Sequence, residues 1–226
     1  MNFYTIFRSR CLITDGAMGT YYSEKYGKDS GAPENDNLTA PQRIEEIHRE
    51  YIEAGADILR TNSFSSNIRT LCAGKAGSMT REEQLQTVYE NVAASCRIAQ
   101  SAVEQEQSRA KEDGREIKEI YIAGDIGPVP EKRGAEEKDA ELIEEYKTMA
   151  KAHLDAGVKL IWFETFSDFE RILPVAEWIR SVSDAFIMVS FSVNVFGYTK
   201  TGMGMRELIK TAKESDLIDG IGFNCG

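Results

Sequence analysis

The chain is poor in the residues that most often carry catalysis or bind metals. It has two histidines and four cysteines in 226 residues. The cysteines form no Cys-x-x-Cys pair, and neither His-Glu-x-x-His nor Gly-x-Ser-x-Gly occurs. These absences argue against a disulfide framework, a self-contained zinc knuckle and a serine-hydrolase elbow. His48 and His153 both fall inside helical patterns, so we predict that they lie on helix surfaces and do not act as bases.

Long apolar runs and excess positive charge are also lacking. No uninterrupted apolar stretch reaches the ~20 residues that span a bilayer. The first ten residues are not followed by the apolar core and cleavage site of a signal peptide. A net charge of −10 disfavours a nucleic-acid backbone as partner, because phosphate binding needs clustered Lys and Arg. We therefore expect a cytoplasmic protein that binds small molecules, with no membrane and no nucleic acid as partner.

What the chain does have is a regular alternation of apolar runs and helical stretches. Six apolar runs each end at a polar residue: 12–15, 56–62, 120–125, 158–164, 186–194 and 218–225. Helices are expected over residues 40–54, 81–111, 136–156, 168–181 and 205–215. This alternation predicts a parallel sheet with crossover helices, whose strand ends carry the active site. We predict an α/β fold, a (β/α)₈ TIM barrel truncated to about six βα units. Residues 1–226 would form one domain that is incomplete at its C-terminus.

An open, doubly wound sheet is the rival architecture, since it also binds ligands at the carboxyl ends of its strands. That fold usually has a glycine-rich phosphate turn after the first strand. The two glycines after the first run, Gly16 and Gly19, are three residues apart and follow Asp15, which does not fit G-x-G-x-x-G. The barrel is therefore favoured.

Helix boundaries and one buried thiol can also be predicted. Thr39 before Pro41 is typical of a helix N-terminus. Gly55 and Gly157 follow the ends of two predicted helices, where glycine accepts the left-handed conformation. Cys96 lies on the apolar stripe of the helix expected over residues 81–111, so we predict a core thiol.

Four sequence motifs are similar to those of the homocysteine S-methyltransferases. They are Asp15-Gly16-Ala17-Met18-Gly19-Thr20, Thr61-Asn62-Ser63-Phe64, Glu164-Thr165-Phe166 and Gly222-Phe223-Asn224-Cys225. Each motif alone is weakly specific, but their order and spacing together resemble this family through nearly the whole chain. The first motif is most similar to the N-terminal homocysteine domain of cobalamin-dependent methionine synthase.

The resemblance implies a zinc ion held by three cysteine thiolates. Cys225 matches the first of these ligands, and the adjacent pair that supplies the other two is absent from the sequence. Zinc coordination removes the thiol proton of homocysteine and leaves a nucleophilic sulfur. On its own, a lone cysteine at the end of a buried strand would be read as a small hydrophobic residue.

The resemblance also implies a site for the amino-acid end of the substrate. Glu164 would hold the ammonium group, and the loop after the first strand would meet the polar end through its backbone amides. The predicted substrate-binding residues are Asp15, Gly16, Ala17, Met18, Gly19, Thr61, Asn62, Glu164 and Asn224. Asp125 and Asn194 would shape the pocket or cap the following helix. Arg60 departs from the family, in which an acidic residue often precedes Thr-Asn.

The function implied is zinc-dependent transfer of a methyl group to the thiolate of L-homocysteine, which forms methionine. The donor is left open, with methylcobalamin or methyltetrahydrofolate favoured, the cobalamin being held by another domain. The chain alone is expected to be inactive, and its two unpaired sheet edges favour a homo-oligomer. A non-catalytic module that binds an amino acid or a partner is the main alternative. An aldolase-like lyase is disfavoured, because Lys159 stands at a strand start and Lys200 in a loop.

Overall fold

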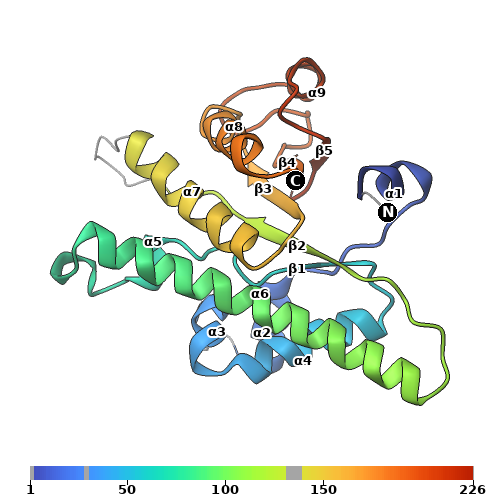
Figure 1. Cartoon of the computed structure of the whole chain (residues 1–226). Coiled ribbons are helices and arrows are strands. Elements are labelled where there is room, and N and C mark those ends of the chain that lie inside the picture. Colours follow the sequence, from blue (N-terminus) through green and yellow to red (C-terminus); the bar gives the residue numbers. More distant parts are fainter. Residues whose placement is uncertain (1–2, 28–30, 131–138, 226) are drawn as a thin grey trace.

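The structure, a computed structural model, describes residues 3–27, 31–130 and 139–225 and is built on a five-stranded parallel sheet. The strands, in the order in which they are hydrogen-bonded, are β1 (Ile58–Arg60), β2 (Tyr121–Ile126), β3 (Leu160–Phe166), β4 (Phe186–Phe191) and β5 (Gly220–Phe223). Neighbouring strands in the sheet are thus also neighbours in the sequence (Figure 1). A doubly wound sheet reverses its strand order at a switch point, so this sequential order favours the barrel over its rival.

The first predicted strand is reduced to a single bridge. Thr14 pairs with Ile58 in parallel, and the amide of Asp15 donates to the carbonyl of Ile58 at 2.9 Å. Ile13 is 64% exposed, so this segment lacks the two-sided burial that stabilises the other strands. The segment nevertheless lies beside β1, where the barrel topology requires it.

Five helices form where the sequence predicts them, with ends shifted by a few residues. They are α4 (Pro41–Glu53), α6 (Arg81–Glu112), α7 (Asp139–Asp155), α8 (Ile172–Val182) and α9 (Met205–Glu214). Positions 136–138 of the third predicted helix lie outside the described residues. Short helical elements that the sequence reading missed are α1 (Phe3–Ser9), α2 (Met18–Tyr26), η2 (Pro33–Asn35), α3 (Asp36–Thr39), α5 (Ile68–Leu71) and η3 (Ala76–Ser78). No helix within the described ranges has the length and apolar character needed to cross a membrane.

The predicted helix boundaries are correct at the two glycines and wrong at Thr39. Gly55 and Gly157 have φ of 104° and 82°, in the left-handed region that favours glycine. Thr39, however, is the last residue of α3, and its hydroxyl donates to the carbonyl of Asn35 at 3.1 Å. Ala40 is the N-cap of α4, and Pro41 begins the helix.

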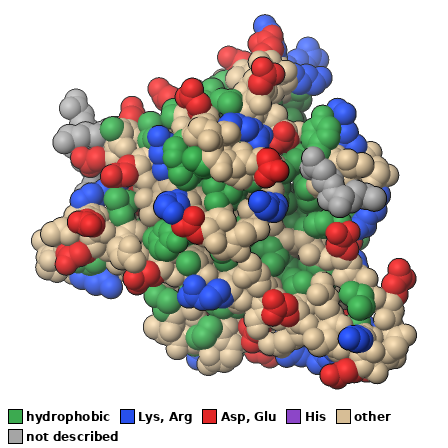
Figure 2. Space-filling view, in the orientation of Figure 1, with side chains coloured by type: hydrophobic (Ala, Val, Ile, Leu, Met, Phe, Trp, Pro, Cys, Tyr) green, Lys and Arg blue, Asp and Glu red, His purple; other side chains and the backbone are tan. Residues whose placement is uncertain are grey.

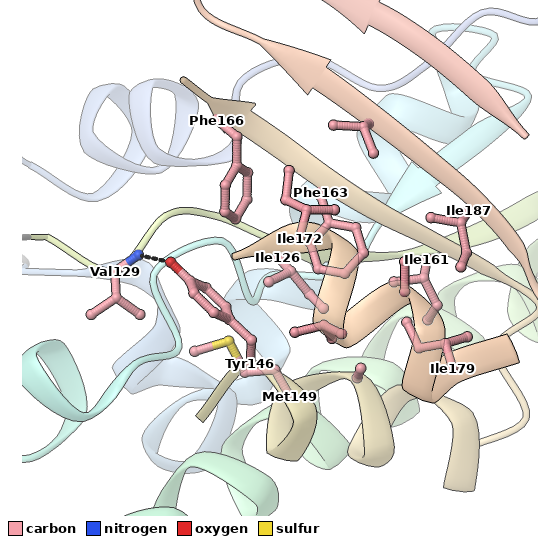
Figure 3. Packing of buried hydrophobic residues seen from close by; sticks show 14 of the residues in the cluster. Ile126, Val129, Tyr146, Met149, Ile161, Phe163, Phe166, Ile172, Ile179 and Ile187 are labelled. Carbon is pink, nitrogen blue, oxygen red and sulfur yellow. Dashed lines mark hydrogen bonds between the residues drawn. The ribbon is translucent and has the colours of Figure 1, made fainter. Parts of the chain in front are cut away.

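The main hydrophobic core lies between the sheet and the helices that follow its strands. Figure 3 shows Ile161, Phe163 and Ile187 of the sheet packed with Tyr146 of α7 and Ile179 of α8. The hydroxyl of Tyr146 accepts a hydrogen bond from the amide of Val129 at 2.7 Å, which satisfies the one polar atom of this ring. This core holds the strands in register and so fixes the positions of the residues at their carboxyl ends.

The other face of the sheet is covered in part by α1. Phe3 makes an edge contact with Tyr121 and another with Phe186, with ring centroids 5.3 and 5.0 Å apart. Tyr121 and Phe186 are the first residues of β2 and β4, so α1 lies at the amino ends of the strands. The aromatic cluster is therefore at the edge opposite to the predicted site.

Both histidines are buried, which corrects the prediction that they lie on helix surfaces. His48 and His153 are 0% exposed, and no histidine is visible on the face drawn in Figure 2. His48 shares the buried stripe of Ile44 and Ile52 on α4, a spacing of four that the sequence already contained. His153 fits against β2 because Gly124 has no side chain: a Cβ there would lie 2.5 Å from the imidazole Cγ.

Candidate functional site

Polar side chains from five segments meet at the carboxyl edge of the sheet. Arg60 ends β1, Glu164 lies near the end of β3, and Asn224 directly follows β5. Asp15 follows the segment that pairs with β1, and Asp125 lies near the end of β2. Because all strands run parallel, these residues share one edge, which is the catalytic edge of a (β/α)₈ barrel.

Arg60 is the centre of this cluster. Its Nε donates to Asp15 Oδ1 at 2.8 Å, and its Nη1 donates to Glu164 Oε1 at 2.6 Å. Nη2 donates to two carbonyl oxygens, of Asp15 at 3.1 Å and of Gly16 at 2.9 Å. The backbone amide of Arg60 also donates to Asp15 Oδ2 at 2.9 Å. One guanidinium thus ties the loop after residue 14 to strand β3.

A second set of contacts joins Glu164 to Cys225. The Nδ2 of Asn224 lies 2.7 Å from Glu164 Oε1, 2.7 Å from Thr165 Oγ1 and 3.4 Å from Cys225 Sγ. The hydroxyl of Thr165 lies 3.7 Å from the same sulfur. Ser192 holds the cysteine backbone, because its hydroxyl donates to the carbonyl of Cys225 at 2.8 Å. The carboxylate and the thiol are therefore linked through one amide side chain.

Thr165 and Cys225 itself adopt unusual backbone conformations. Thr165 has φ of 66° and Cys225 has φ of 50°, and they are the two non-glycine residues with positive φ in the described part of the chain. For a β-branched residue such as threonine this conformation is strained. Such strain persists where the surrounding structure imposes it, and it is often found at functional sites.

Burial and charge act against each other in this cluster. Burial raises the pKa of Asp15 to about 6, although Arg60 opposes the shift. Burial, and then the nearby Glu164 carboxylate, raise the pKa of Asp125 well above its usual range. Burial disfavours the charged form of Arg60, but the surrounding carboxylates outweigh it and raise its pKa above the ordinary value. The buried guanidinium of Arg60 therefore stays charged beside these carboxyl groups.

Two acceptor atoms of the cluster lack hydrogen-bond donors. Asp125 Oδ1 and Asn224 Oδ1 are buried and have no hydrogen-bond partner among the described residues. An unpaired buried acceptor costs roughly 1–3 kcal/mol, so both atoms favour a ligand that donates hydrogen bonds. An ammonium group has three donors and no acceptor.

The predicted loop residues 16–19 lead into a helix N-terminus. Ala17 is the N-cap of α2 and provides no side-chain cap, and Met18 and Gly19 are the first helical residues. The first amides of a helix lack intrahelical partners and favour anions. Gly16 lies against Tyr51, where a Cβ would be 2.7 Å from the hydroxyl, whereas the Cβ position of Gly19 is open. The side chain of Met18 packs against the hydrophobic cluster that contains Tyr22, Ile44 and Ile47.

Three other predicted residues lie outside the cluster around Arg60. Thr61 is buried, and its Oγ1 accepts a hydrogen bond from the amide of Asp125 at 3.0 Å, so it supports the end of β2. The Nδ2 of Asn62 donates to the carbonyl of Pro33 and to Asn37 Oδ1, both at 2.9 Å. Asn194 is exposed and accepts from two amides of its own loop. The assignment of Thr61 and Asn62 to substrate binding stays a prediction. Asn194 does not cap the following helix, because Gly204 is the N-cap of α9, and its part in shaping the pocket stays a prediction.

The cysteines divide into two buried and two exposed side chains. Cys96 is fully buried, which confirms the predicted core thiol, and Cys72 is buried as well. Cys11 and Cys225 are exposed. Across the described ranges, no group of three His, Cys, Asp or Glu side chains is arranged to hold a metal ion. These residues offer Cys225 alone as a thiolate at the carboxyl edge, which does not make a complete zinc site.

Sequence reasoning missed three residues of the cluster. It noted Arg60 as a departure but gave it no role, and it left Thr165 and Ser192 unassigned. Thr165 follows Glu164 within a quoted motif, so its position at a strand end was a usable signal. No sequence signal marked Ser192, because its role depends on β4 lying beside β5.

The geometry agrees with comparisons with known proteins. The family model described as homocysteine S-methyltransferase matches residues 12–226, and the chain belongs to this family. Among curated relatives it is 25% identical over 232 residues to a methionine synthase of Mycobacterium tuberculosis (strain ATCC 25618 / H37Rv), and this match covers 97% of the chain. The chain spans 18% of the length of that relative.

Solved structures show the same fold. The metallated form of the homocysteine methyltransferase MmuM from Escherichia coli superposes with a TM-score of 0.77 and 19% identity, covering 98% of this chain and 77% of that one. Its oxidized form gives 0.76 and 21%, covering 97% and 75%. The predicted α/β fold is confirmed, and a sheet of this order is compatible with a truncated barrel.

Proposed function

We propose that this protein transfers a methyl group to the thiolate of L-homocysteine, which forms methionine, and that residues 1–226 are its homocysteine-binding domain. Family membership supports this activity. The single observation that carries it is the link from Glu164 through Asn224 to Cys225. This link places a group suited to an ammonium beside a thiol at the same edge of the sheet.

The polar end of the amino acid would be bound by groups of opposite charge. Glu164, with the free acceptors Asp125 Oδ1 and Asn224 Oδ1, suits the ammonium group. The amides at the start of α2 suit the carboxylate, since an uncapped helix N-terminus favours anions. Such two-point binding would orient the side-chain sulfur of homocysteine towards Cys225.

The proposal extends to a zinc ion and a methyl donor. Cys225 would be one thiolate ligand of the zinc that this family is expected to use, and the other ligands would have to come from outside the described residues. The described residues alone do not form a complete zinc site. Methylcobalamin, recharged from methyltetrahydrofolate and held by another domain, is the donor that we favour.

The test is methionine formation by the full-length protein supplied with homocysteine and each candidate donor in turn. We expect Cys225→Ser to abolish methyl transfer, because a hydroxyl is a poor substitute for a thiolate ligand. Cys11→Ser is the matched control, since Cys11 is also exposed but precedes the first strand. Equal activity of the two variants would refute the assignment of Cys225.

A non-catalytic amino-acid-binding module is the second candidate. It is favoured by the finding that the described residues provide Cys225 alone as a possible thiolate at the site. The same experiment separates the two functions. Binding of homocysteine without methionine formation from any donor, measured on full-length protein loaded with zinc, would favour the binding module.

A further inference from the structure

Arg60 occupies a place that the proposed function would give to the substrate. Its Nε and Nη1 bridge Asp15 Oδ1 and Glu164 Oε1, the two carboxylates predicted to meet the amino-acid end of homocysteine. The guanidinium is therefore a cation already held between them.

The guanidinium of Arg60 is largely buried within the site. The side chain of Arg60 is 16% exposed, and those of Asp15 and Glu164 are 2% and 9% exposed. Its charge centre also lies 5.9 Å from the ring centroid of Trp162, within the range of a cation–π contact. Glu164 Oε1 accepts from both Arg60 and Asn224, so this oxygen has little capacity left for a further donor.

We propose that Arg60 is a specificity-determining residue: a resident cation that makes this site depend only weakly on the α-ammonium group of its thiol substrate. An arriving ammonium must either share Glu164 with Arg60 or displace it. In the first case the new ion pair is weakened by repulsion from the guanidinium. In the second case the ammonium pairs with Glu164 only by breaking the ion pair between Glu164 and Arg60. Either way the ion pair with Glu164 adds little, and the gain from the ammonium is limited to hydrogen bonds with the unpaired acceptors Asp125 Oδ1 and Asn224 Oδ1.

The inference rests on the proposed function and defines its substrate class more broadly. The site would accept thiols that carry a carboxylate with or without the neighbouring ammonium. The probe is 4-mercaptobutanoate, which differs from homocysteine by having hydrogen in place of the ammonium group. Calorimetric titration of the full-length protein with each thiol, under reducing conditions, gives the ratio of the two dissociation constants.

We expect the wild-type protein to bind the two thiols with affinities within about tenfold of each other. In Arg60→Gln, the affinity for homocysteine relative to that for 4-mercaptobutanoate should rise at least about tenfold. The reason is that the ammonium group then makes a charge-assisted hydrogen bond to Glu164 without competition from the guanidinium. Arg60→Lys keeps the charge and should keep the low ratio. Arg43→Gln, which removes an exposed arginine paired with Asp36, is the matched control and should behave as wild type.

The outcomes separate this inference from the proposed function. If wild type binds homocysteine more than about a hundredfold tighter than 4-mercaptobutanoate, the role of Arg60 is wrong while homocysteine stays the substrate. An unchanged ratio in Arg60→Gln also overturns it. If neither thiol binds the wild-type protein, the proposed function fails, and this inference with it. If Arg60→Gln does not fold, the ratio of the two dissociation constants measured for the wild-type protein still tests the inference.

Discussion

The imidazole of His153 lies 3.2 Å from the sulfur of Cys96 through its Nδ1, and both side chains are fully buried. The Nε2 of the same ring is 3.4 Å from the hydroxyl of Ser63, which donates to the carbonyl of Asp125 at 2.7 Å. Burial lowers the pKa of His153 to about 3 and raises that of Cys96 to about 12. The pair is therefore neutral at physiological pH, and it supports the end of β2 rather than acting as a nucleophile and base.

The first prediction concerns the space that this imidazole occupies. Gly124→Ala would place a Cβ 2.5 Å from His153 Cγ, so the ring or strand β2 must shift. We expect a loss of about 1–3 kcal/mol in the free energy of unfolding. Gly77→Ala is the control, because nothing lies within 4 Å of its Cβ position. Denaturant unfolding of both variants checks this, and an equal stability of the two would contradict the packing described.

The second prediction concerns the dependence of stability on pH. Burial lowers the pKa of His48 to about 4, and neither ring nitrogen has a hydrogen-bond partner in the described structure. The imidazole of His48 therefore takes up a proton near pH 6.5 in the unfolded chain, but it stays neutral in the folded chain until the pH is near 4. The stability due to neutral His48 is fully present above pH 6.5 and is lost as the pH falls towards 4, by about 2 kcal/mol at pH 5.

His48→Leu should remove this part of the pH dependence. The variant should gain stability over wild type as the pH falls from 7 to 5, measured by urea unfolding at each pH. Asp15 acts in the opposite sense, since its raised pKa favours the folded state at low pH, but it is present in both proteins. If the difference in the free energy of unfolding between variant and wild type does not change with pH, the description of His48 as a buried, unpaired imidazole is wrong.

The third prediction concerns zinc. The full-length protein should bind one zinc ion, and Cys225→Ser should lose most of that affinity. The isolated chain of residues 1–226 should bind zinc weakly, because its described residues offer a single thiolate at the site. Metal analysis after dialysis, with Cys11→Ser as control, measures both. Stoichiometric zinc in the isolated chain would show that other ligands are available within it.

The fourth prediction concerns the edge of the sheet. Within the described residues, β5 pairs with β4 on one side and with no strand on the other. Exposed strand edges present unpaired amides and carbonyls to other chains. We expect the isolated chain to form dimers or larger species as its concentration rises, measured by light scattering. A monomer at every concentration would show that this edge is protected.

Much of the fold could be predicted because strand and helix periods alternate clearly along the chain. The sequential strand order follows from that alternation once a barrel is assumed. Helix α2 was missed because it begins among the glycines of the first motif and has no strong apolar stripe. The prediction that the histidines are exposed rests on their polarity, although the spacing of Ile44, His48 and Ile52 already indicates burial.

The site was predictable only in part. That Asp15, Glu164 and Asn224 share an edge follows from their positions after apolar runs. That Arg60 lies between two of them does not, because it depends on the register of β1 against its neighbours and on the path of its long side chain. The roles of these residues in binding substrate are still predictions.

The contacts of Arg60 also bear on when the site forms during folding. Arg60 is 104 residues from Glu164 and 45 residues from Asp15 along the chain, and Asn224 is a further 60 residues beyond Glu164. Contacts between such distant residues close large loops and form late. On the ribosome, Asn224 cannot join the cluster until nearly the whole described chain has emerged. Until then Arg60 can already pair with both Asp15 and Glu164, so this arginine would also stabilise the growing sheet before β5 is added.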